Sequence, residues 1–400
     1  MKAGWNIKPL GDVCSVTNGG TPKSSVASYW GGDVNWLTPK DMGKMDGRNI
    51  GKTPRTISDE GLASCSARLV PSNSVIMSTR APIGHLAIND VPMAFNQGCR
   101  GMVPGNNLDS IYLFYFLSMN REALNDLGTG ATFKELSSAP LKAFPIPLPP
   151  LEEQQRIVAV LDEAFEGLAR ARAHAEANLQ NAQELLAVVL DKIFASDDPS
   201  WKAEALSELC MIGDGNHSSK YPKKSEMVAD GVPFLRSSNI QNGAIDRNEM
   251  LYISDAKHAE LKKGHLKGGD VLFTNRGEIG KVAIVPEDLE GANLNSQVAW
   301  LRCGEQIDCR FLFFFLQSGR MKRFYLDTQS GAALQQFTIK MLKAVSVSFP
   351  PRDSQKAAVH RIDQMQKNVS VLESSYQALL QDITDLRQSI LHRAFAGELT

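Results

Sequence analysis

The chain contains an internal repeat, and this repeat restricts the possible folds more than any other feature. The segment VIMSTRAPIGHLAI at 75–88 recurs as VLFTNRGEIGKVAI at 271–284, an offset of 196 residues. The aromatic run at 112–117 recurs at 311–316, and the Pro-Pro pair at 149–150 recurs 201 residues later. A collinear series of this kind indicates a duplication, so we expect two copies of one structural unit.

Each copy begins with a lobe of mixed secondary structure. Short apolar runs bounded by Gly, Pro, Asn and Ser are typical of strands. The predicted strands are 34–37, 75–78, 232–235 and 271–274. The two aromatic runs are uniformly apolar, and their spacing favours buried helices. The sequence therefore predicts an α+β fold with two α/β domains, at residues 1–150 and 199–350.

A long helix is predicted after each lobe, in the segments 151–198 and 351–400. Residues 151–194 contain no proline and a single glycine, Gly167, so they can form a rod of about 66 Å at about 1.5 Å per residue. Apolar residues recur along both segments in alternating steps of four and three, as in a coiled coil. The predicted seam residues are Ile157, Leu161, Leu168 and Leu185, followed by Ile362, Val369, Leu372 and Ile383.

The order of lobe, helix, lobe and helix predicts how the two helices pair. The first helix leaves the first lobe and the second must return, so a packed pair is antiparallel. Small seam residues of the first helix would then face larger ones of the second. We expect a pseudo-twofold repeat in which a pair of long antiparallel coiled-coil helices separates the lobes. The alternative is that each helix packs separately on its own lobe.

The charges are unevenly distributed, although the net charge is only −1. Residues 1–150 carry 14 basic and 11 acidic side chains, and residues 199–350 carry 19 and 17. Residues 151–198 carry 4 and 10. Both lobes are mildly basic, which favours contact between the lobes and phosphate groups.

The sequence lacks the features of several other classes of protein. The six cysteines show no Cys-x-x-Cys spacing, which argues against a disulfide framework and a zinc site. No apolar run approaches the roughly 18 residues of a membrane span. The N-terminus lacks the apolar stretch of a signal peptide, so we expect a cytoplasmic protein.

The motifs of common enzymes are also absent from the sequence. There is no Gly-x-x-x-x-Gly-Lys-Ser/Thr phosphate loop, no Gly-x-Ser-x-Gly elbow and no Gly-rich dinucleotide fingerprint after a strand. The Asn-Pro-Pro-Tyr or Asp-Pro-Pro-Tyr motif of adenine methyltransferases does not occur either. We therefore expect binding rather than catalysis, with no catalytic residue, metal ion or cofactor in this chain.

Polar and basic residues recur at matching places in the lobes. Arg80 and Arg276 each follow a strand and precede a Gly-containing turn. A guanidinium suits phosphate or guanine, and it equally suits a structural ion pair. Gln97 and Gln297 also recur, and glutamine can read adenine or cap a strand end. The candidate DNA-binding residues are Thr21, Lys23, Arg80, Gln97, His217, Ser218, Lys220, Arg236, Arg276 and Gln297.

The two ends of each long helix resemble those of the specificity subunit of type I restriction-modification systems. The opening PLPPLEEQQRIVAVLDE at 147–163 and its echo FPPRDSQKAAVHRIDQ at 349–364 carry the resemblance, together with the endings DKIFA and HRAFAGEL. The resemblance covers the whole chain. It implies that each lobe is a target recognition domain that reads one half of a bipartite site in double-stranded DNA.

The resemblance also implies partners. The helices would set the gap between the half-sites and bind two methyltransferase subunits, which carry S-adenosylmethionine, with or without two motor-endonuclease subunits. The chain itself would be a non-catalytic subunit. A coiled-coil scaffold with two protein- or peptide-binding lobes is the alternative function. Because the loops at 21–30 and 216–224 differ in length and chemistry, we expect the two half-sites to differ.

Overall fold

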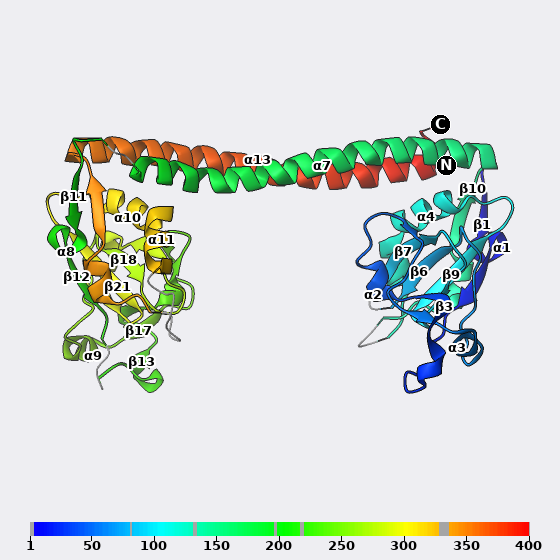
Figure 1. The fold of residues 1–400 in the computed structure, drawn as a ribbon, viewed down its shortest axis with the longest axis horizontal. Coiled ribbons are helices and arrows are strands. Elements are labelled where there is room, and N and C mark those ends of the chain that lie inside the picture. Colours follow the sequence, from blue (N-terminus) through cyan, green and yellow to red (C-terminus); the bar gives the residue numbers. More distant parts are fainter. Residues whose placement is uncertain are drawn as a thin grey trace. The chain divides into compact units, whose positions relative to one another are not determined.

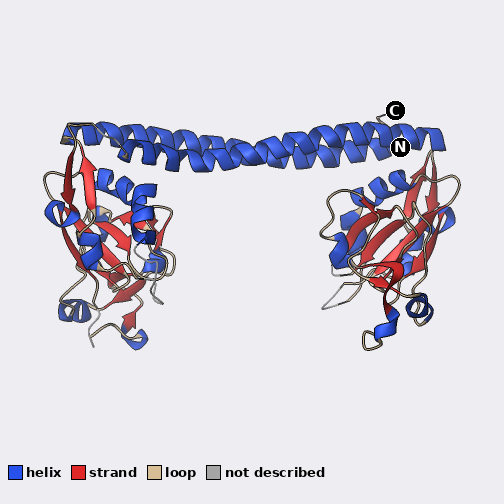
Figure 2. Cartoon of the chain, in the orientation of Figure 1, coloured by secondary structure: helices blue, strands red, loops and turns tan. Residues whose placement is uncertain are grey.

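The computed structural model describes residues 4–80, 82–130, 134–195, 198–216, 220–327 and 336–399. Contacts divide the chain into two compact units. Unit 1 comprises Met1–Ala175 with Leu379–Thr400, and unit 2 comprises Glu176–Ala378. Each unit therefore contains one lobe together with part of each long helix (Figures 1 and 2).

The lobe of unit 1, lobe 1, is built on a five-stranded sheet of order β2-β9-β6-β7-β4. These strands span Cys14–Asn18 (β2), Cys99–Pro104 (β9), Val75–Thr79 (β6), Ile83–Asn89 (β7) and Asn49–Ile50 (β4). The central strand β6 is buried at every position. A second sheet has the order β5-β3-β8, and β1 pairs with β10. Those strands span Thr56–Ile57 (β5), Trp30–Leu37 (β3), Ala94–Phe95 (β8), Asn6–Pro9 (β1) and Pro145–Leu148 (β10).

Short helices cover the sheets of lobe 1. They span Leu10–Val13 (α1), Ala27–Tyr29 (η1), Pro39–Met42 (α2), Asp59–Ala63 (α3), Ser110–Met119 (α4), Arg121–Asp126 (α5) and Ser138–Ala143 (α6). The aromatic run forms α4, which begins where the Asp109 carboxylate accepts hydrogen bonds from the amides of Ile111 and Tyr112. The predicted buried helix is confirmed, since the ring of Tyr112 is fully buried.

The lobe of unit 2, lobe 2, repeats this design. Its main sheet has the order β12-β21-β18-β19, with strands Cys210–Asp214 (β12), Val298–Cys303 (β21), Val271–Thr274 (β18) and Val282–Ile284 (β19). A second sheet has the order β13-β17-β14-β20, with strands Met227–Val228 (β13), Leu251–Ile253 (β17), Val232–Leu235 (β14) and Asn293–Leu294 (β20). Two further pairs are β11 with β22 and β15 with β16, which span Lys202–Ala205 (β11), Ser346–Phe349 (β22), Ile240–Gln241 (β15) and Ala244–Ile245 (β16).

The helices of lobe 2 lie at corresponding places in the chain. They span Leu206–Leu209 (α8), Lys224–Glu226 (η2), Ser237–Asn239 (η3), Asp255–Glu260 (α9), Glu287–Leu289 (η4), Cys309–Gln317 (α10), Gly319–Asp327 (α11) and Ile339–Lys343 (α12). The equivalent sheet orders β2-β9-β6-β7 and β12-β21-β18-β19 confirm the duplication. All four predicted strands are also confirmed, as parts of β3, β6, β14 and β18.

The two long helices are continuous, α7 from Leu151 to Phe194 and α13 from Arg352 to Ala396. A buried glutamine fastens the start of α7 to lobe 1. Its side chain, Gln154, donates from Nε2 to the carbonyls of Asn107 and Pro149, at 2.9 and 2.8 Å, and accepts from the amide of Asp109 at 2.9 Å.

The same connection occurs in unit 2. Gln355 of α13 donates to the carbonyls of Gln306 and Pro350, at 2.8 and 2.9 Å, and accepts from the amide of Asp308 at 2.8 Å. A buried amide is stable where its donors and acceptor are all used. This requirement explains why a glutamine, Gln154 or Gln355, lies four residues after the Pro-Pro pair in both copies.

The long helices pack antiparallel within each unit. In unit 1, Ile157 and Leu161 near the start of α7 share a core with Leu391 and Ala394 near the end of α13. In unit 2, Leu190 and Phe194 near the end of α7 share a core with Val359 and Ile362 near the start of α13. The antiparallel pair is confirmed, and the alternative that the two helices pack separately, each only on its own lobe, is wrong.

The seam between the helices is narrower than the sequence pattern suggests. Five predicted seam residues are buried, namely Ile157, Leu161, Ile362, Val369 and Ile383, and two are partly buried, Leu168 and Leu185. The prediction for Leu372 is wrong, because its side chain is 40% exposed. On α13 the buried residues Ile362, Val369 and Ile383 are separated by seven and fourteen residues. A single partner helix does not cover the other apolar heptad position, where Leu372 lies.

Among the described residues, no helix is both long and apolar enough to cross a bilayer.

Candidate nucleic-acid interface

The loops that follow three strands of lobe 1 meet at one edge of its sheets. Ser78 at the end of β6 pairs with Cys99 at the start of β9, and Asn18 at the end of β2 pairs with Arg100. The neighbouring β3 ends at the same edge, because the amide of Asn96 donates to the carbonyl of Leu37 at 2.9 Å. We call the side chains gathered here the strand-end cluster of lobe 1, which comprises Thr21, Arg80, Asn96, Gln97, Arg100 and Glu135.

A close approach of two backbone segments brings Thr21 into this cluster. A Cβ atom at Gly19 would lie 1.9 Å from the carbonyl oxygen of Asn96, so this position admits no side chain. The chain can therefore pass directly beside the start of β9. Two residues later the hydroxyl of Thr21 donates a hydrogen bond to the side-chain oxygen of Gln97.

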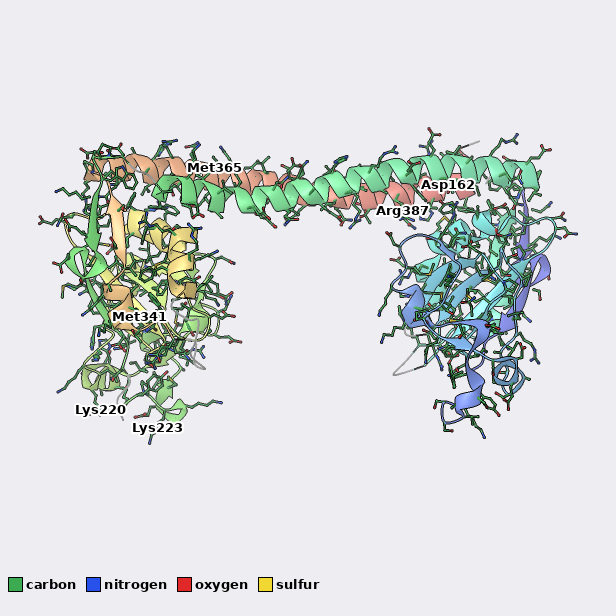
Figure 3. All side chains as sticks on the ribbon, viewed as in Figure 1. Asp162, Lys220, Lys223, Met341, Met365 and Arg387 are labelled. Carbon is green, nitrogen blue, oxygen red and sulfur yellow. The ribbon has the colours of Figure 1, made fainter. Side chains whose placement is uncertain are left out.

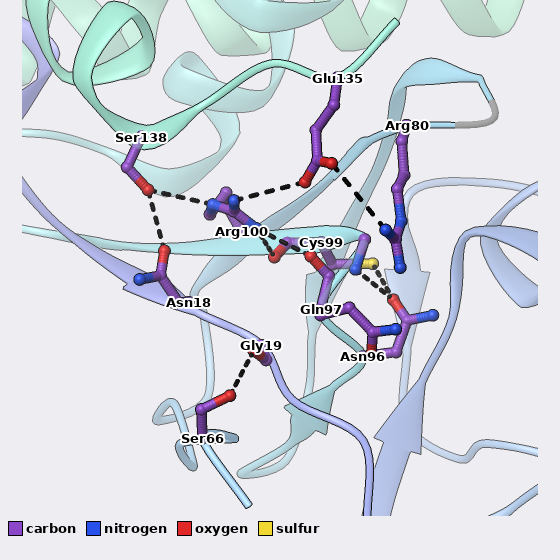
Figure 4. Close-up of polar contacts among 11 residues, drawn as sticks. Asn18, Gly19, Ser66, Arg80, Asn96, Gln97, Cys99, Arg100, Glu135 and Ser138 are labelled. Atoms are coloured by element: carbon purple, nitrogen blue, oxygen red, sulfur yellow. Dashed lines mark hydrogen bonds and ion pairs between the residues drawn. The ribbon is translucent and has the colours of Figure 1, made fainter. Parts of the chain in front are cut away.

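Glu135 lies between two guanidinium groups in the cluster. Its carboxylate oxygens lie 3.9 Å from Nη1 of Arg80 and 3.8 Å from Nη2 of Arg100, as Figure 4 shows. Arg100 also donates from Nε to Ser138 at 3.0 Å and from Nη1 to the carbonyl of Gln97 at 2.9 Å. Burial lowers the pKa of Arg100, and the Glu135 carboxylate opposes this effect. Arg100 is thus fixed in place, whereas Arg80 is the more exposed of the two.

Glycine also controls where Arg80 lies. A Cβ atom at Gly98 would lie 2.9 Å from Nε of Arg80, so the arginine side chain crosses directly over this glycine. Any larger residue at position 98 would displace the guanidinium. The position of Arg80 is therefore set both by Gly98 beneath it and by Glu135 beside it.

Lobe 2 builds an equivalent edge. Thr274 at the end of β18 pairs with Val298 at the start of β21, and the amide of Asn295 donates to the carbonyl of Leu235 at 2.9 Å. A Cβ atom at Gly215 would lie 2.1 Å from the carbonyl oxygen of Asn295, which repeats the close approach of lobe 1. The strand-end cluster of lobe 2 comprises Arg236, Ser237, Arg276, Asn295, Gln297 and Gln336.

Arg276 has a neutral partner in this cluster. The amide of Gln336, with its oxygen turned toward Arg276, accepts hydrogen bonds from Nε at 3.2 Å and from Nη2 at 2.9 Å. The sequence left open that both recurrent arginines form structural ion pairs instead of contacting DNA. Each arginine does have a partner within its own lobe, but only the partner of Arg80 is charged. Both side chains are nevertheless only half-buried.

The expected match between Gln97 and Gln297 is wrong by one residue. Cys99 and Val298 occupy the same place in their sheets, so Gln297 corresponds to Gly98 and Gln97 to Ser296. Gln297 accepts hydrogen bonds from Oγ of Ser237 at 2.9 Å and from Nδ2 of Asn295 at 3.2 Å. The offset between the copies changes from 196 to 199 between β18 and β21. The match between the two glutamines assumed an offset of 200 and is therefore displaced by one residue.

Arg236 is a member of the lobe 2 cluster, whereas Lys23 and Lys220 belong to neither cluster. Arg236 donates from Nη2 to the carbonyl of Glu249 at 2.9 Å, while its buried Nε has no partner among the described residues. Lys220 forms an ion pair of 3.2 Å with Glu260, and Figure 3 shows Lys220 on the part of lobe 2 farthest from the long helices. Lys23 is exposed. His217 and Ser218 lie outside the described residues.

Sequence reasoning missed several members of the clusters. Glu135 and Gln336 were not singled out, although they are separated by the same 201 residues as the Pro-Pro pairs. Arg100 and Asn295 were missed as well, because their roles depend on strand register. The sequence signal for Glu135 and Gln336 was their offset of 201 residues. This signal is hard to recognise because the two residues differ in type.

Comparisons with known proteins agree with this architecture. Residues 2–174 and 199–381 each match the family described as type I restriction modification DNA specificity domain. The type I restriction enzyme MjaIX specificity subunit of Methanocaldococcus jannaschii is 28% identical over 309 residues, which cover 72% of this chain and 71% of that protein. The type I restriction enzyme EcoKI specificity subunit of Escherichia coli K12 is 25% identical, and the match covers 100% of this chain and 90% of that protein.

Solved structures share the fold. A chain from work on complex assembly and conformational transition of the type I R-M system superposes with a TM-score of 0.79 at 21% identity, covering 100% of this chain and 99% of the other. The HsdS subunit from Thermoanaerobacter tengcongensis gives a TM-score of 0.66 at 21% identity, covering 100% and 98%. With two matched domains and the duplicated lobes, this chain belongs to the family of type I restriction-modification DNA specificity subunits.

Proposed function

We propose that each lobe reads one half of a bipartite site in double-stranded DNA through its strand-end cluster. The observation that carries this proposal is the equivalent placement of Arg80 and Arg276, each half-buried at the end of a central strand. A guanidinium held at a loop edge can donate two hydrogen bonds to O6 and N7 of guanine. Hydroxyl and amide groups beside it, such as Thr21 and Gln297, can contact bases or phosphates.

The two clusters differ in chemistry, so the proposed half-sites differ. Lobe 1 presents an arginine beside a carboxylate, whereas lobe 2 presents an arginine beside an amide. Lobe 1 has glycine at position 98, where lobe 2 has the side chain of Gln297. The two lobes share one fold but would present two different sets of hydrogen-bonding groups. A DNA site whose two halves differ in sequence would match both sets.

We further propose that the helix pair sets the gap between the half-sites. Each lobe is fastened to a long helix by a fully hydrogen-bonded glutamine, Gln154 in unit 1 and Gln355 in unit 2. The continuous helix α7 joins the two lobes along the chain. A lobe anchored to a helix cannot slide along it, so the helix length would fix the number of base pairs between the two reading surfaces.

The same helices are proposed to bind two methyltransferase subunits, with or without motor-endonuclease subunits. In unit 1, Leu379 and Leu386 lie one heptad apart on α13 and are 43% and 49% exposed. Exposed leucines at helical spacing favour a partner surface. The methyltransferase subunits would carry S-adenosylmethionine and perform the chemistry, while this chain would act as a non-catalytic subunit that supplies the specificity.

Two experiments test this function. Sequencing of methylated bases in cells that carry the complete system is expected to give one motif with two defined halves and a constant gap. A duplex of that sequence should then compete better than a random duplex in a gel shift at fixed salt, in the presence of the methyltransferase. Equal competition by the two duplexes would contradict the proposal and favour the alternative of protein- or peptide-binding lobes.

A further inference from the structure

Glu135 and Gln336 occupy the same place in their lobes, each directly opposite the arginine of its cluster. Arg80 forms an antiparallel backbone bridge with Glu135, and Arg276 forms one with Gln336. The adjoining hydrogen bonds also match, from the amide of Leu136 to the carbonyl of Thr79 and, in lobe 2, from Phe337 to Asn275, both at 2.9 Å. The pairing is therefore a property of the backbone and occurs in both lobes.

Core packing holds this backbone arrangement in place. The residues that follow the bridges, Leu136 and Phe337, are fully buried. Two side chains directly opposite each other in an antiparallel pair point to the same side and lie within reach of one another. The partner of each arginine is thus presented by a segment that the core anchors.

The partners differ in charge, and the neighbouring residues explain the difference. Glu135 also lies 3.8 Å from the half-buried Arg100, which needs a compensating anion. In lobe 2 the strand position of Arg100 is occupied by Ala299, because Asn18 pairs with Arg100 and Asp214 pairs with Ala299. No second guanidinium occupies that strand position, so a neutral amide suffices. The feature common to both lobes is an acceptor oxygen beside the arginine.

We infer that the acceptor oxygen at positions 135 and 336 positions the guanidinium for one base of each half-site and so sets the base preference there. This inference rests on the proposed function. An arginine has five N–H donors in a planar fork and a long flexible stem. An acceptor that occupies one edge of the fork fixes the direction of the donors that remain. The remaining donors are then already oriented when DNA binds. Binding of the preferred base therefore costs less conformational entropy of the arginine side chain.

Four substitutions test the inference in the complete system, with the methylated sites of the cell as readout. Glu135→Ala removes the acceptor, and we expect discrimination at one base pair of the half read by lobe 1 to fall about tenfold. Glu135→Gln keeps an acceptor oxygen and is expected to keep that base preference. Gln336→Ala should relax one base pair of the other half, while Gln336→Glu should preserve it.

Controls separate this role from a structural one. Glu135 is 44% exposed and removes little buried surface when replaced. Loss of the anion beside Arg100 should lower the thermal unfolding midpoint equally in Glu135→Ala and Glu135→Gln, so only the positioning role predicts different base preferences for the two variants. The neighbouring exposed Lys134, which pairs with Asp126, provides the matched control Lys134→Ala, with no expected change in base preference.

The outcomes are distinct for the inference and for the proposed function. A uniform fall in methylation in both alanine variants, with no base position relaxed, would overturn the inference. Equal relaxation by Glu135→Ala and Glu135→Gln would also overturn it, because the amide should replace the carboxylate. A wild-type system without a two-part motif would instead contradict the proposed function itself.

Discussion

Arg48 donates from Nη1 and Nη2 to the two carboxylate oxygens of Asp162, at 2.5 and 3.0 Å. Arg48 precedes β4 and Asp162 lies on α7 (Figure 3), so this ion pair ties lobe 1 to the long helix. The hydroxyl of Tyr115 on α4 also donates to Asp162. In unit 2, Arg310 donates to Asp363 on α13 at 2.6 Å, and Asp363 lies 201 residues after Asp162. Both units thus add a charged contact about two helical turns beyond the buried glutamine.

Replacement of Asp162 by asparagine should weaken the attachment of lobe 1 to α7. The bidentate geometry strengthens the pair, but both side chains are partly exposed and solvent screens their charges. We expect the free energy of unfolding to fall by about 1 kcal/mol, measured by denaturant titration. Glu166→Gln is the control, because its exposed i,i+4 pair with Arg170 should contribute less than about 0.5 kcal/mol. Equal losses in the two variants would contradict the assignment.

The contribution of Asp162 should depend on pH. Burial alone would raise the pKa of this carboxyl, but hydrogen bonds from Arg48 and Tyr115 outweigh burial and hold the pKa below its ordinary value. A lowered folded-state pKa stabilises the fold above the unfolded pKa of about 3.9, and this stabilisation is lost as pH falls through the folded pKa. The difference in unfolding free energy between wild type and Asp162→Asn should therefore be constant from about pH 7 to about pH 5 and shrink below about pH 4. A difference that grows in acid would show that another group is responsible.

Removal of the helix-anchoring glutamines should cost more than loss of the ion pair. Gln154→Ala leaves the amide of Asp109 and the carbonyls of Asn107 and Pro149 without their partner. An unsatisfied buried polar group costs roughly 1–3 kcal/mol. We expect a loss of about 3 kcal/mol in the unfolding free energy of the full chain. The adjacent Gln155 is exposed, so Gln155→Ala should change stability by less than about 0.5 kcal/mol.

The cluster arginines should act separately on the two half-sites. Arg80→Ala is expected to relax one base pair in the half read by lobe 1, and Arg276→Ala one base pair in the other half. The loss of a bidentate contact corresponds to roughly a tenfold loss of discrimination or more. Sequencing of methylated sites in cells that carry each variant provides the measurement. If one substitution altered both halves in the same way, the assignment of one lobe to one half would be incorrect.

The sequence was sufficient for the repeat, the helices and the four strands, because these depend on local patterns. Apolar periodicity predicted α7 and α13, and the chain order predicted that they pair antiparallel. Periodicity could not predict that Leu372 stays exposed, since the heptad pattern marks every apolar position while one partner helix covers only part of them.

The candidate site was less predictable than the fold. Arg80 and Arg276 were found because residue type and offset both recur. Glu135 and Gln336 were missed because they differ in type and lie far in sequence from the arginines that they contact. The pairing of Gln97 with Gln297 failed because an insertion between β19 and β20 changes the offset from 196 to 199. Long-range contacts and register shifts of this kind become visible only in the folded chain.

The central claim, that two lobes read two half-sites at a distance set by the helices, is tested most directly by shortening both helices. Deletion of residues 171–177 from α7 and 375–381 from α13 removes one heptad from each, about 10 Å of helix or roughly three base pairs of DNA. Methylated sites should then show a gap that is shorter by about three base pairs, or methylation should be lost, and any remaining motif should keep the bases of both halves. An unchanged gap, or altered bases within a half-site, would contradict the account.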